Sequence, residues 1–226
     1  MTNFEHKPYI EISDKGYRKG NLLMEFLKAE APITDYKTYL DRFLKEGVKF
    51  NGTNLWLGNV LTKDLVFAHN QEAAGYFETA AAGGSFANGR VGEPWFKQTL
   101  GIKLIDEAFA TARSIEELKN SLFKAAGCIT KPASEAEWPP LFHLPDEERY
   151  ENSSIFLRPH DSGGRTCATV SSSVILVETD GTLRFFERRY DHGKRLDIAD
   201  ASDKVDGIDY TDAAFTEDCY IHKFSV

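Results

Sequence analysis

His160, Asp161 and Cys167 place an imidazole, a carboxylate and a thiol in one short stretch of the chain. A thiol beside an imidazole base is a pattern used in nucleophilic catalysis. Closeness along the sequence does not establish contact in space, and we expect a loop histidine and a strand cysteine without a catalytic role. The chain has no Walker loop, dinucleotide fingerprint, His-Glu-x-x-His or Cys-x-x-Cys motif.

Two further patterns have simple structural interpretations. Gly83, Gly84 and Ser85 resemble a phosphate-binding loop only weakly, because neither a helix start nor a lysine follows at the required place. Arg184, Arg188 and Arg189 form a small basic cluster, which we interpret as the solvated face of a strand.

Composition excludes several functional classes. The chain has 226 residues, a net charge of −8 and a pI of about 5.3, which argues against nucleic acid or an anionic membrane as partner. Its three cysteines are too few and too scattered for a disulfide framework or a zinc site, so we expect no metal or other cofactor. Neither a signal peptide nor a membrane span is visible, which predicts a cytoplasmic protein.

The first part of the chain alternates patterns typical of helices and strands. Each expected element has a start or stop signal, such as a cap, a proline or a glycine. The sequence predicts helices over 21–28, after a Thr34 cap, after Pro94 and after a capping box at Ser114 to Glu117, with a strand pair over 53–60 and 65–68.

The last third is richer in β-formers. Asp180-Gly181 is a hairpin signal between two of the strands, and the acidic segment 190–218 predicts an exposed loop. The simplest interpretation is one α+β domain over 1–226 with mostly antiparallel sheets. Its expected late strands cover 153–158, 168–178, 183–189 and 219–224.

Several segments, in order along the chain, resemble the NRDE family, whose members are also called transport and Golgi organisation protein 2 homologues. Each similarity is weak alone, but the ordered set spans nearly the whole chain. Residues 1–4 are similar to the family's "LTN(F/Y)" strand, 18–27 to its "RG-x-LV…FL" helix, 50–55 to "YNGFNL", 87–95 to "LSN…TPW", and 172–188 to the closing hairpin "TVILVD-x-DG…F-x-ER".

The resemblance implies an Ntn-hydrolase-like fold, an αββα sandwich of two antiparallel sheets between helical layers. Family members begin with a Met-Cys strand, followed by an Asn-Arg-Asp-Glu motif and a "GGTWLG" segment. This sequence has none of the three, so we expect an incomplete sandwich that lacks its N-terminal strands. Apolar side chains such as Trp56, Phe67 and Phe185 should then be partly unsheltered, which favours low stability or self-association through exposed sheet edges.

The resemblance also implies candidate pocket residues. Asn3 matches the "TN" position and Asn88 the "SN" position, so both are similar to oxyanion-side donors. Arg165 resembles the "G(T)R" residue of a late strand. Two departures accompany these matches: 85–88 reads Ser-Phe-Ala-Asn where "GLSN" is usual, and Arg165 lies about five residues too far from Asp180. The asparagines could equally be turn or strand-end residues.

Three functional hypotheses follow. The resemblance implies a non-catalytic role in Golgi organisation, secretion, or lipid or haem trafficking, with a small hydrophobic ligand and possible association with the Golgi or mitochondria. The second hypothesis is a cysteine Ntn-type amidohydrolase, similar to penicillin acylase, whose nucleophile segment lies outside this chain. The third is a protein-interaction module that uses exposed apolar faces.

Overall fold

The computed structural model describes fourteen parts of the chain and divides it into two compact units, Met1–Pro94 and Trp95–Val226. Each unit is described by itself below, and the prediction of a single domain over 1–226 stays a prediction. The described residues are 2–4, 19–29, 35–45, 52–59, 64–72, 75–80, 85, 87, 94–141, 144–162, 165–192, 202–205, 208–211 and 213–224.

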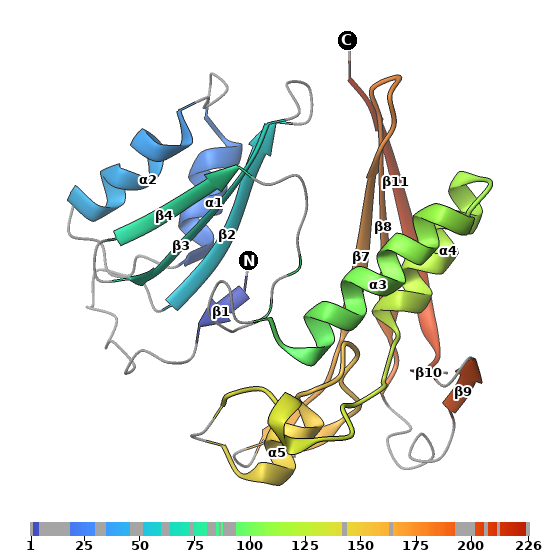
Figure 1. Cartoon of the computed structure of the whole chain (residues 1–226). Coiled ribbons are helices and arrows are strands. Elements are labelled where there is room, and N and C mark those ends of the chain that lie inside the picture. The colour runs from blue at the N-terminus through green and yellow to red at the C-terminus, as the bar shows by residue number, and fades with distance from the viewer. Residues whose placement is uncertain are drawn as a thin grey trace. The chain divides into compact units, whose positions relative to one another are not determined.

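The first unit is an antiparallel sheet with two helices (Figure 1). Its strands follow the order β1-β2-β3-β4, and each pairs with the next. The sequence-based expectations of two helices and a strand pair are confirmed. The elements are β1 (Thr2–Phe4), α1 (Lys19–Leu27), α2 (Tyr36–Lys45), β2 (Gly52–Asn59), β3 (Asp64–Glu72) and β4 (Gly75–Ala80).

The helix α2 packs against β2 through an apolar cluster. Leu55 and Leu57 share one face of β2 because side chains alternate along a strand, and both are buried against residues of α2. The cap of α2 differs from our expectation. Asp35, rather than Thr34, accepts the backbone hydrogen bond of Thr38 at 2.9 Å, and a carboxylate at this position favours the helix start.

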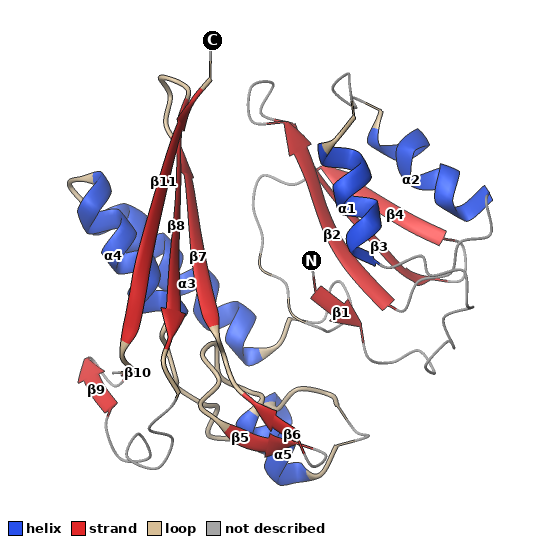
Figure 2. Cartoon of the chain, turned by 180° about the vertical axis from the view of Figure 1, so that it is seen from behind, coloured by secondary structure: helices blue, strands red, loops and turns tan. Residues whose placement is uncertain are grey.

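The second unit places two helices on one face of a three-stranded antiparallel sheet (Figure 2). The sheet has the order β11-β8-β7, and its helix-facing core joins Phe123, Val174, Leu176 and Phe186. The two helices and the three strands of this sheet are α3 (Phe96–Thr111), α4 (Ile115–Ala126), β7 (Ser171–Val177), β8 (Thr182–Tyr190) and β11 (Phe215–Lys223).

The predicted capping box starts α4 in a modified form. The Ser114 side chain accepts from the backbone of Glu117 at 3.1 Å, as expected. The Glu117 carboxylate reaches back to the backbone of Arg113 at 2.7 Å, one residue before the cap. The box therefore still satisfies two backbone donors at the helix start.

Our expectation of a strand over 153–158 is wrong. Ser153 and Ser154 bond locally, to the carbonyl oxygens of Tyr150 at 2.6 Å and Phe156 at 2.7 Å. Such local bonds compete with a strand ladder. The structure forms the following elements around this segment: η1 (Glu135–Glu137), α5 (Asp146–Glu151), β5 (His160–Ser162) and β6 (Arg165–Cys167).

The segment 190–218 also differs from the expected exposed loop. It contains a paired hairpin of β9 (Ser202–Val205) and β10 (Ile208–Thr211). Tyr210 is only 8 % exposed and packs in a cluster with Leu104 and Cys128. Burial of this aromatic ring stabilises the hairpin in an otherwise acidic stretch.

The expected exposure of three aromatic residues is only partly confirmed. Trp56 and Phe185 are half-buried, but Phe67 is 1 % exposed. Phe67 lies directly opposite Trp56 in the β2–β3 ladder, and their ring centroids are 5.4 Å apart. Cross-strand aromatic packing therefore contributes to sheltering Phe67.

The β7–β8 hairpin confirms the Asp180-Gly181 signal. Gly181 has a φ of 81°, and the Asp180 carboxylate accepts from the backbone of Thr182 at 3.0 Å. We predict that Gly181→Ala lowers the free energy of unfolding by about 1 kcal/mol, because a Cβ is disfavoured at this φ. Gly181→Asn should cost less, since asparagine tolerates this region better. Urea unfolding of both variants tests this order, and equal losses would contradict it.

The fold class is mixed α+β with antiparallel sheets. Among the described helices, none combines the length and apolar character that a bilayer crossing requires.

Candidate functional site

Of the three expected pocket residues, the two that the structure describes belong to separately described parts of the chain. Asn3 lies in β1 opposite Thr53, whereas Arg165 lies in β6 opposite Ser162, in the other unit. Asn88 lies outside the described residues. Their shared site therefore stays a prediction.

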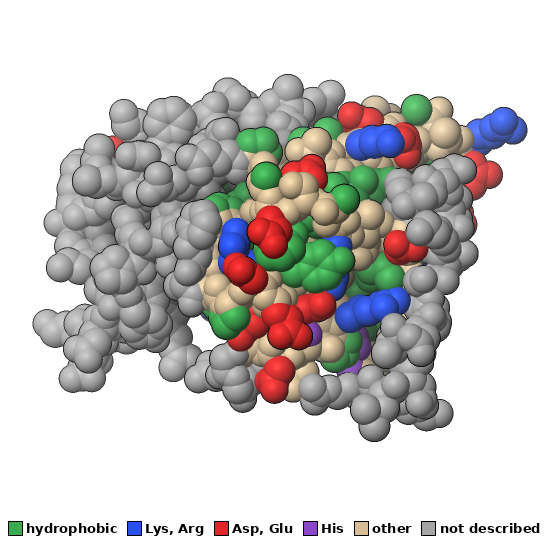
Figure 3. Space-filling view, turned by 60° about the horizontal axis from the view of Figure 1, so that its bottom comes forward, with side chains coloured by type: hydrophobic (Ala, Val, Ile, Leu, Met, Phe, Trp, Pro, Cys, Tyr) green, Lys and Arg blue, Asp and Glu red, His purple; other side chains and the backbone are tan. Residues whose placement is uncertain are grey.

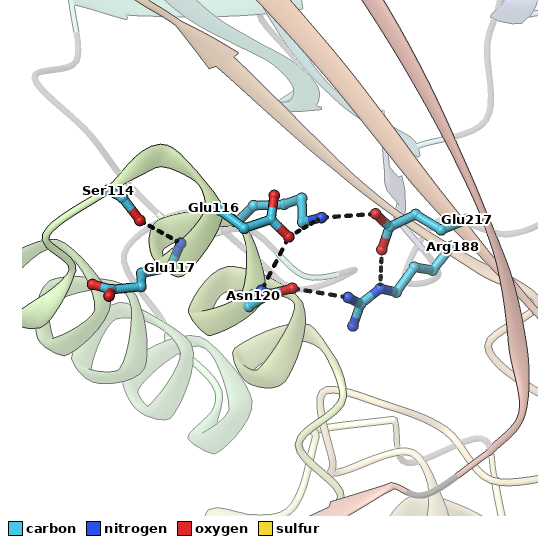
Figure 4. A network of polar contacts seen from close by, with 7 residues as sticks. Ser114, Glu116, Glu117, Asn120, Arg188 and Glu217 are labelled. Carbon is cyan, nitrogen blue, oxygen red and sulfur yellow. Dashed lines mark hydrogen bonds and ion pairs between the residues drawn. The ribbon is translucent and has the colours of Figure 1, made fainter.

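The most connected polar cluster of the second unit joins α4 to the sheet (Figure 4). Glu217 of β11 lies at its centre and binds two cations with its two oxygens. Oε1 accepts from Lys119 Nζ at 2.9 Å, and Oε2 accepts from Arg188 Nε at 2.7 Å. Lys119 also pairs with Glu116 at 2.7 Å, and Asn120 Oδ1 accepts from Arg188 at 3.2 Å.

Helix spacing and strand register bring these five residues together. Glu116, Lys119 and Asn120 are three and four residues apart on α4, so they share one helix face. Glu217 lies directly opposite Arg188 in the β8–β11 ladder. The network therefore depends on both the α4 sequence and the register of the sheet.

Our interpretation of the arginine cluster as a solvated face is wrong for Arg188. Its side chain is 16 % exposed, and its guanidinium lies 4.1 Å from the ring of Phe123 and 4.3 Å from the ring of Phe215. These are cation–π distances. Arg184 and Arg189 lie in ion pairs with neighbouring carboxylates, so the three arginines do not form one basic surface.

The network shifts the pKa of its members. Burial acts to lower the pKa of Lys119, but hydrogen bonds from its ammonium to Glu116 and Glu217 outweigh it, so this pKa is raised. Burial likewise acts to raise the pKa of Glu217, and the bonds from Lys119 and Arg188 reverse this and lower it. The hydrogen bond from Lys119 is the main cause of the lowered pKa of Glu116. Each shift favours the charged form.

We predict that acid weakens this unit through Glu217. Because its pKa is lower in the folded than in the unfolded chain, its stabilising contribution is complete above the ordinary value of 4.5 and is lost as the pH falls through the folded pKa. Urea unfolding between pH 7 and pH 3 should show this loss. In Glu217→Gln, the free energy of unfolding should fall less steeply as the pH is lowered. An unchanged pH dependence would contradict the assignment of this loss to Glu217.

The β5–β6 hairpin contains a second group of interest. His160 and Cys167 lie directly opposite each other in this ladder, although the sequence alone did not predict that they meet. The Nδ1 atom of His160 is 3.0 Å from the carbonyl oxygen of Arg158, and its Nε2 atom is buried without a hydrogen-bond partner. Only the strand register reveals this pairing.

The other two cysteines differ from Cys167 in their surroundings. Cys128 is fully buried in the core, and burial raises the pKa of its thiol. Cys219 is exposed on β11, opposite Phe186. Cys167 is half-buried and has a histidine opposite it.

Acidic residues of α5 lie beside the β5–β6 hairpin. Figure 3 shows acidic side chains gathered on the face seen from below, with histidine side chains beside them. The first turn of α5 contains Asp146, Glu147 and Glu148, and Glu148 accepts a hydrogen bond from Ser162 of β5 at 2.5 Å. In the described residues, no group of three or more His, Cys, Asp or Glu side chains is arranged to hold a metal ion.

The comparison with protein families decides the family. The model described as Transport and Golgi organisation 2 matches residues 1–192. The chain belongs to the Transport and Golgi organisation 2 family. The match covers β1 to β8, so the resemblance drawn from the ordered sequence segments is confirmed for this family. No curated protein matches the chain.

Proposed function

We propose that this member of the Transport and Golgi organisation 2 family has a non-catalytic role in Golgi organisation or secretion. The family match over residues 1–192 is the observation that supports it. In the described residues, the partly buried cation–carboxylate network around Glu217 is closed: Glu217 uses both oxygens within the protein. Such a network suits a structural role better than proton transfer to a substrate.

Removal of the gene from a cell that expresses this chain tests the proposal. Golgi membranes should disperse and a secreted reporter should leave the cell more slowly, and expression of the chain should reverse both effects. Normal Golgi morphology and secretion after removal would overturn the proposed role.

We further propose that the role involves a small hydrophobic ligand, with haem and lipid as the two chemical classes. The support is the resemblance to the family. Titration of the purified chain with haem, followed by its absorption spectrum, and with a fluorescent fatty acid separates the two. If the absorption spectrum of haem does not shift, haem is excluded as the ligand. If the fluorescence of the fatty acid does not change, lipid is excluded.

The alternative function is that of a cysteine Ntn-type amidohydrolase. The packing of helices on a sheet within each unit favours this alternative. Each unit combines an antiparallel sheet with two helices, which is the combination that half of an αββα sandwich requires. Such an enzyme uses the side chain of an N-terminal cysteine as nucleophile and the α-amino group of the same residue as base. Release of product from acyl-amide substrates would favour the enzyme over the non-catalytic role.

Self-association is a separate prediction. The outward face of the β11-β8-β7 sheet carries Ile175, Val177 and Tyr220, all exposed, and β7 and β11 are its two edges within the described residues. We expect the apparent size in size-exclusion chromatography to rise with concentration, because such faces and edges favour association. Ile175→Lys should reduce this rise, and a constant monomeric size would contradict the prediction.

A further inference from the structure

We propose that two copies of this chain join at the edge of β7, through an antiparallel pairing of β7 with the β7 strand of the second copy. The pairing rests on the self-association predicted above and adds its strand, its partner and its register. The joined sheet has the order β11-β8-β7 in one copy and continues as β7-β8-β11 in the other.

The hydrogen bonds between β7 and β8 define the open edge of β7. At one end of this ladder Tyr190 donates to the carbonyl oxygen of Val170 at 3.0 Å, and at the other end Glu178 donates to that of Thr182 at 2.8 Å. Backbone groups alternate in direction along a strand, so the even-numbered residues of β7 bond to β8 and the odd-numbered residues face the edge. Within the described residues, no further strand pairs with these edge residues, which are Ser171, Ser173, Ile175 and Val177.

The sequence of β7 does not protect this edge. Proteins usually protect an exposed sheet edge with charged residues, proline or a bulge. The strand reads Ser-Ser-Ser-Val-Ile-Leu-Val, without charge, proline or glycine, and it pairs with β8 in one continuous register. The other edge strand, β11, contains Glu217, Asp218 and Lys223. Of the two edges, that of β7 is therefore the one suited to receive a further strand.

An identical strand satisfies the β7 edge along its whole length. A two-fold axis beside Val174 places Ser173 opposite Ile175 of the second copy, so the outward N–H and C=O groups of each strand meet partners. Like charges directly opposite each other destabilise a strand pair, and β7 has no charge to oppose its own copy. Segments of high β-propensity without charge or proline are those that pair with identical segments. The occupant that these observations favour is a second copy of this chain.

Ser173→Pro tests the backbone pairing. Proline at this position removes an N–H group that faces the edge and no hydrogen bond to β8. It also leaves the exposed apolar side chains of Ile175 and Val177 in place. The two-fold axis makes each copy lose a hydrogen bond, so we expect the dimer dissociation constant to rise about tenfold or more. Analytical ultracentrifugation measures this constant, and circular dichroism reports whether the variant is folded.

Ile221→Pro on β11 is the matched control. Asp191 donates to the carbonyl oxygen of Ala214 at 2.8 Å, and Phe224 donates to that of Gly181 at 3.0 Å. The odd-numbered residues of β11 therefore face away from β8, as Ser173 does on the opposite edge. Ile221→Pro should leave the dissociation constant unchanged.

A cysteine at position 174 tests the register without a proline. Val174→Cys is made in a chain that also carries Cys167→Ser and Cys219→Ser. Cys128 stays in place because it is fully buried. In the proposed register residue 174 faces its own copy in a non-hydrogen-bonded pair, where Cα atoms lie about 4.5 Å apart, which suits a disulfide. Mild oxidation should give a disulfide-linked dimer, and Ile221→Cys in the same background, although 60 % exposed, should give much less.

The outcomes separate this pairing from association in general. A chain that stays monomeric at every concentration overturns both. A dimer that persists in Ser173→Pro, or that weakens equally in Ile221→Pro, overturns the β7 pairing alone and points to the apolar sheet face. So does a disulfide yield of Val174→Cys no higher than that of Ile221→Cys. If Ser173→Pro fails to fold, the comparison of the two disulfide yields decides.

Discussion

Replacing Phe123 by alanine is expected to lower the free energy of unfolding of the second unit by about 4 kcal/mol. Phe123 is 1 % exposed and packs against Val174, Leu176 and Phe186, so it attaches α4 to the sheet. Its ring also lies 4.1 Å from the guanidinium of Arg188. The substitution therefore leaves a cavity and removes a cation–π partner. Urea unfolding followed by circular dichroism measures the loss.

Phe109→Ala is the matched control for this prediction. Phe109 lies on α3 in the same unit but is 61 % exposed. Because its ring is largely hydrated already, its removal should cost less than about 1 kcal/mol. Similar losses in the two variants would contradict the assignment of Phe123 to the core between α4 and the sheet.

Glu217→Gln is expected to lower the free energy of unfolding by about 1.5 kcal/mol, because its hydrogen bonds are charge-assisted but the carboxylate is partly exposed. Both carboxylate oxygens of Glu217 accept from cations, Lys119 and Arg188, whose side chains are 9 % and 16 % exposed. Glutamine has the same shape but only one acceptor oxygen, so its amide group would face a donor. Two poorly hydrated cations would then lose a shared counter-charge. Chemical unfolding at neutral pH measures this effect.

The adjacent residue on β11 provides the control. Asp218 pairs with Arg189, whose side chain is 55 % exposed. Such a solvated ion pair contributes at most about 1 kcal/mol, so Asp218→Asn should change stability little. If Asp218→Asn cost as much as Glu217→Gln, the burial of Lys119 and Arg188 would not be the cause of the larger effect. Added salt should weaken the Asp218 pair more than the Glu217 pair.

The two large effects share one origin in the structure. Arg188 contacts both Phe123 through its guanidinium face and Glu217 through its Nε atom. The losses in the two variants should therefore not be additive in the double mutant, because both act on the same side chain.

The amino-acid sequence by itself determined the local features of this protein. The Ser114 to Glu117 box starts α4, and the Asp180-Gly181 turn joins β7 to β8. The ordered segments were also sufficient to indicate the family that the match over 1–192 confirms. These signals are local because caps, turns and periodic apolar positions act over a few neighbouring residues.

Only the tertiary structure decided which distant residues meet. Arg188 looked solvated in the sequence, but the register with β11 places Glu217 opposite it and α4 covers it. Tyr210 lies in an acidic stretch, yet it is buried with Cys128. Conversely, Ser153 and Ser154 form local bonds that prevent the expected strand.

The β5–β6 hairpin likewise separates what the sequence shows from what the folded structure decides. The sequence supplied His160 and Cys167, but a shift of the ladder by one residue would turn their side chains to opposite faces. In a hairpin, the register depends on the conformation of the joining loop and on how the strands pack in the folded unit. The residue types were therefore readable from the sequence, and their pairing was a property of the folded chain.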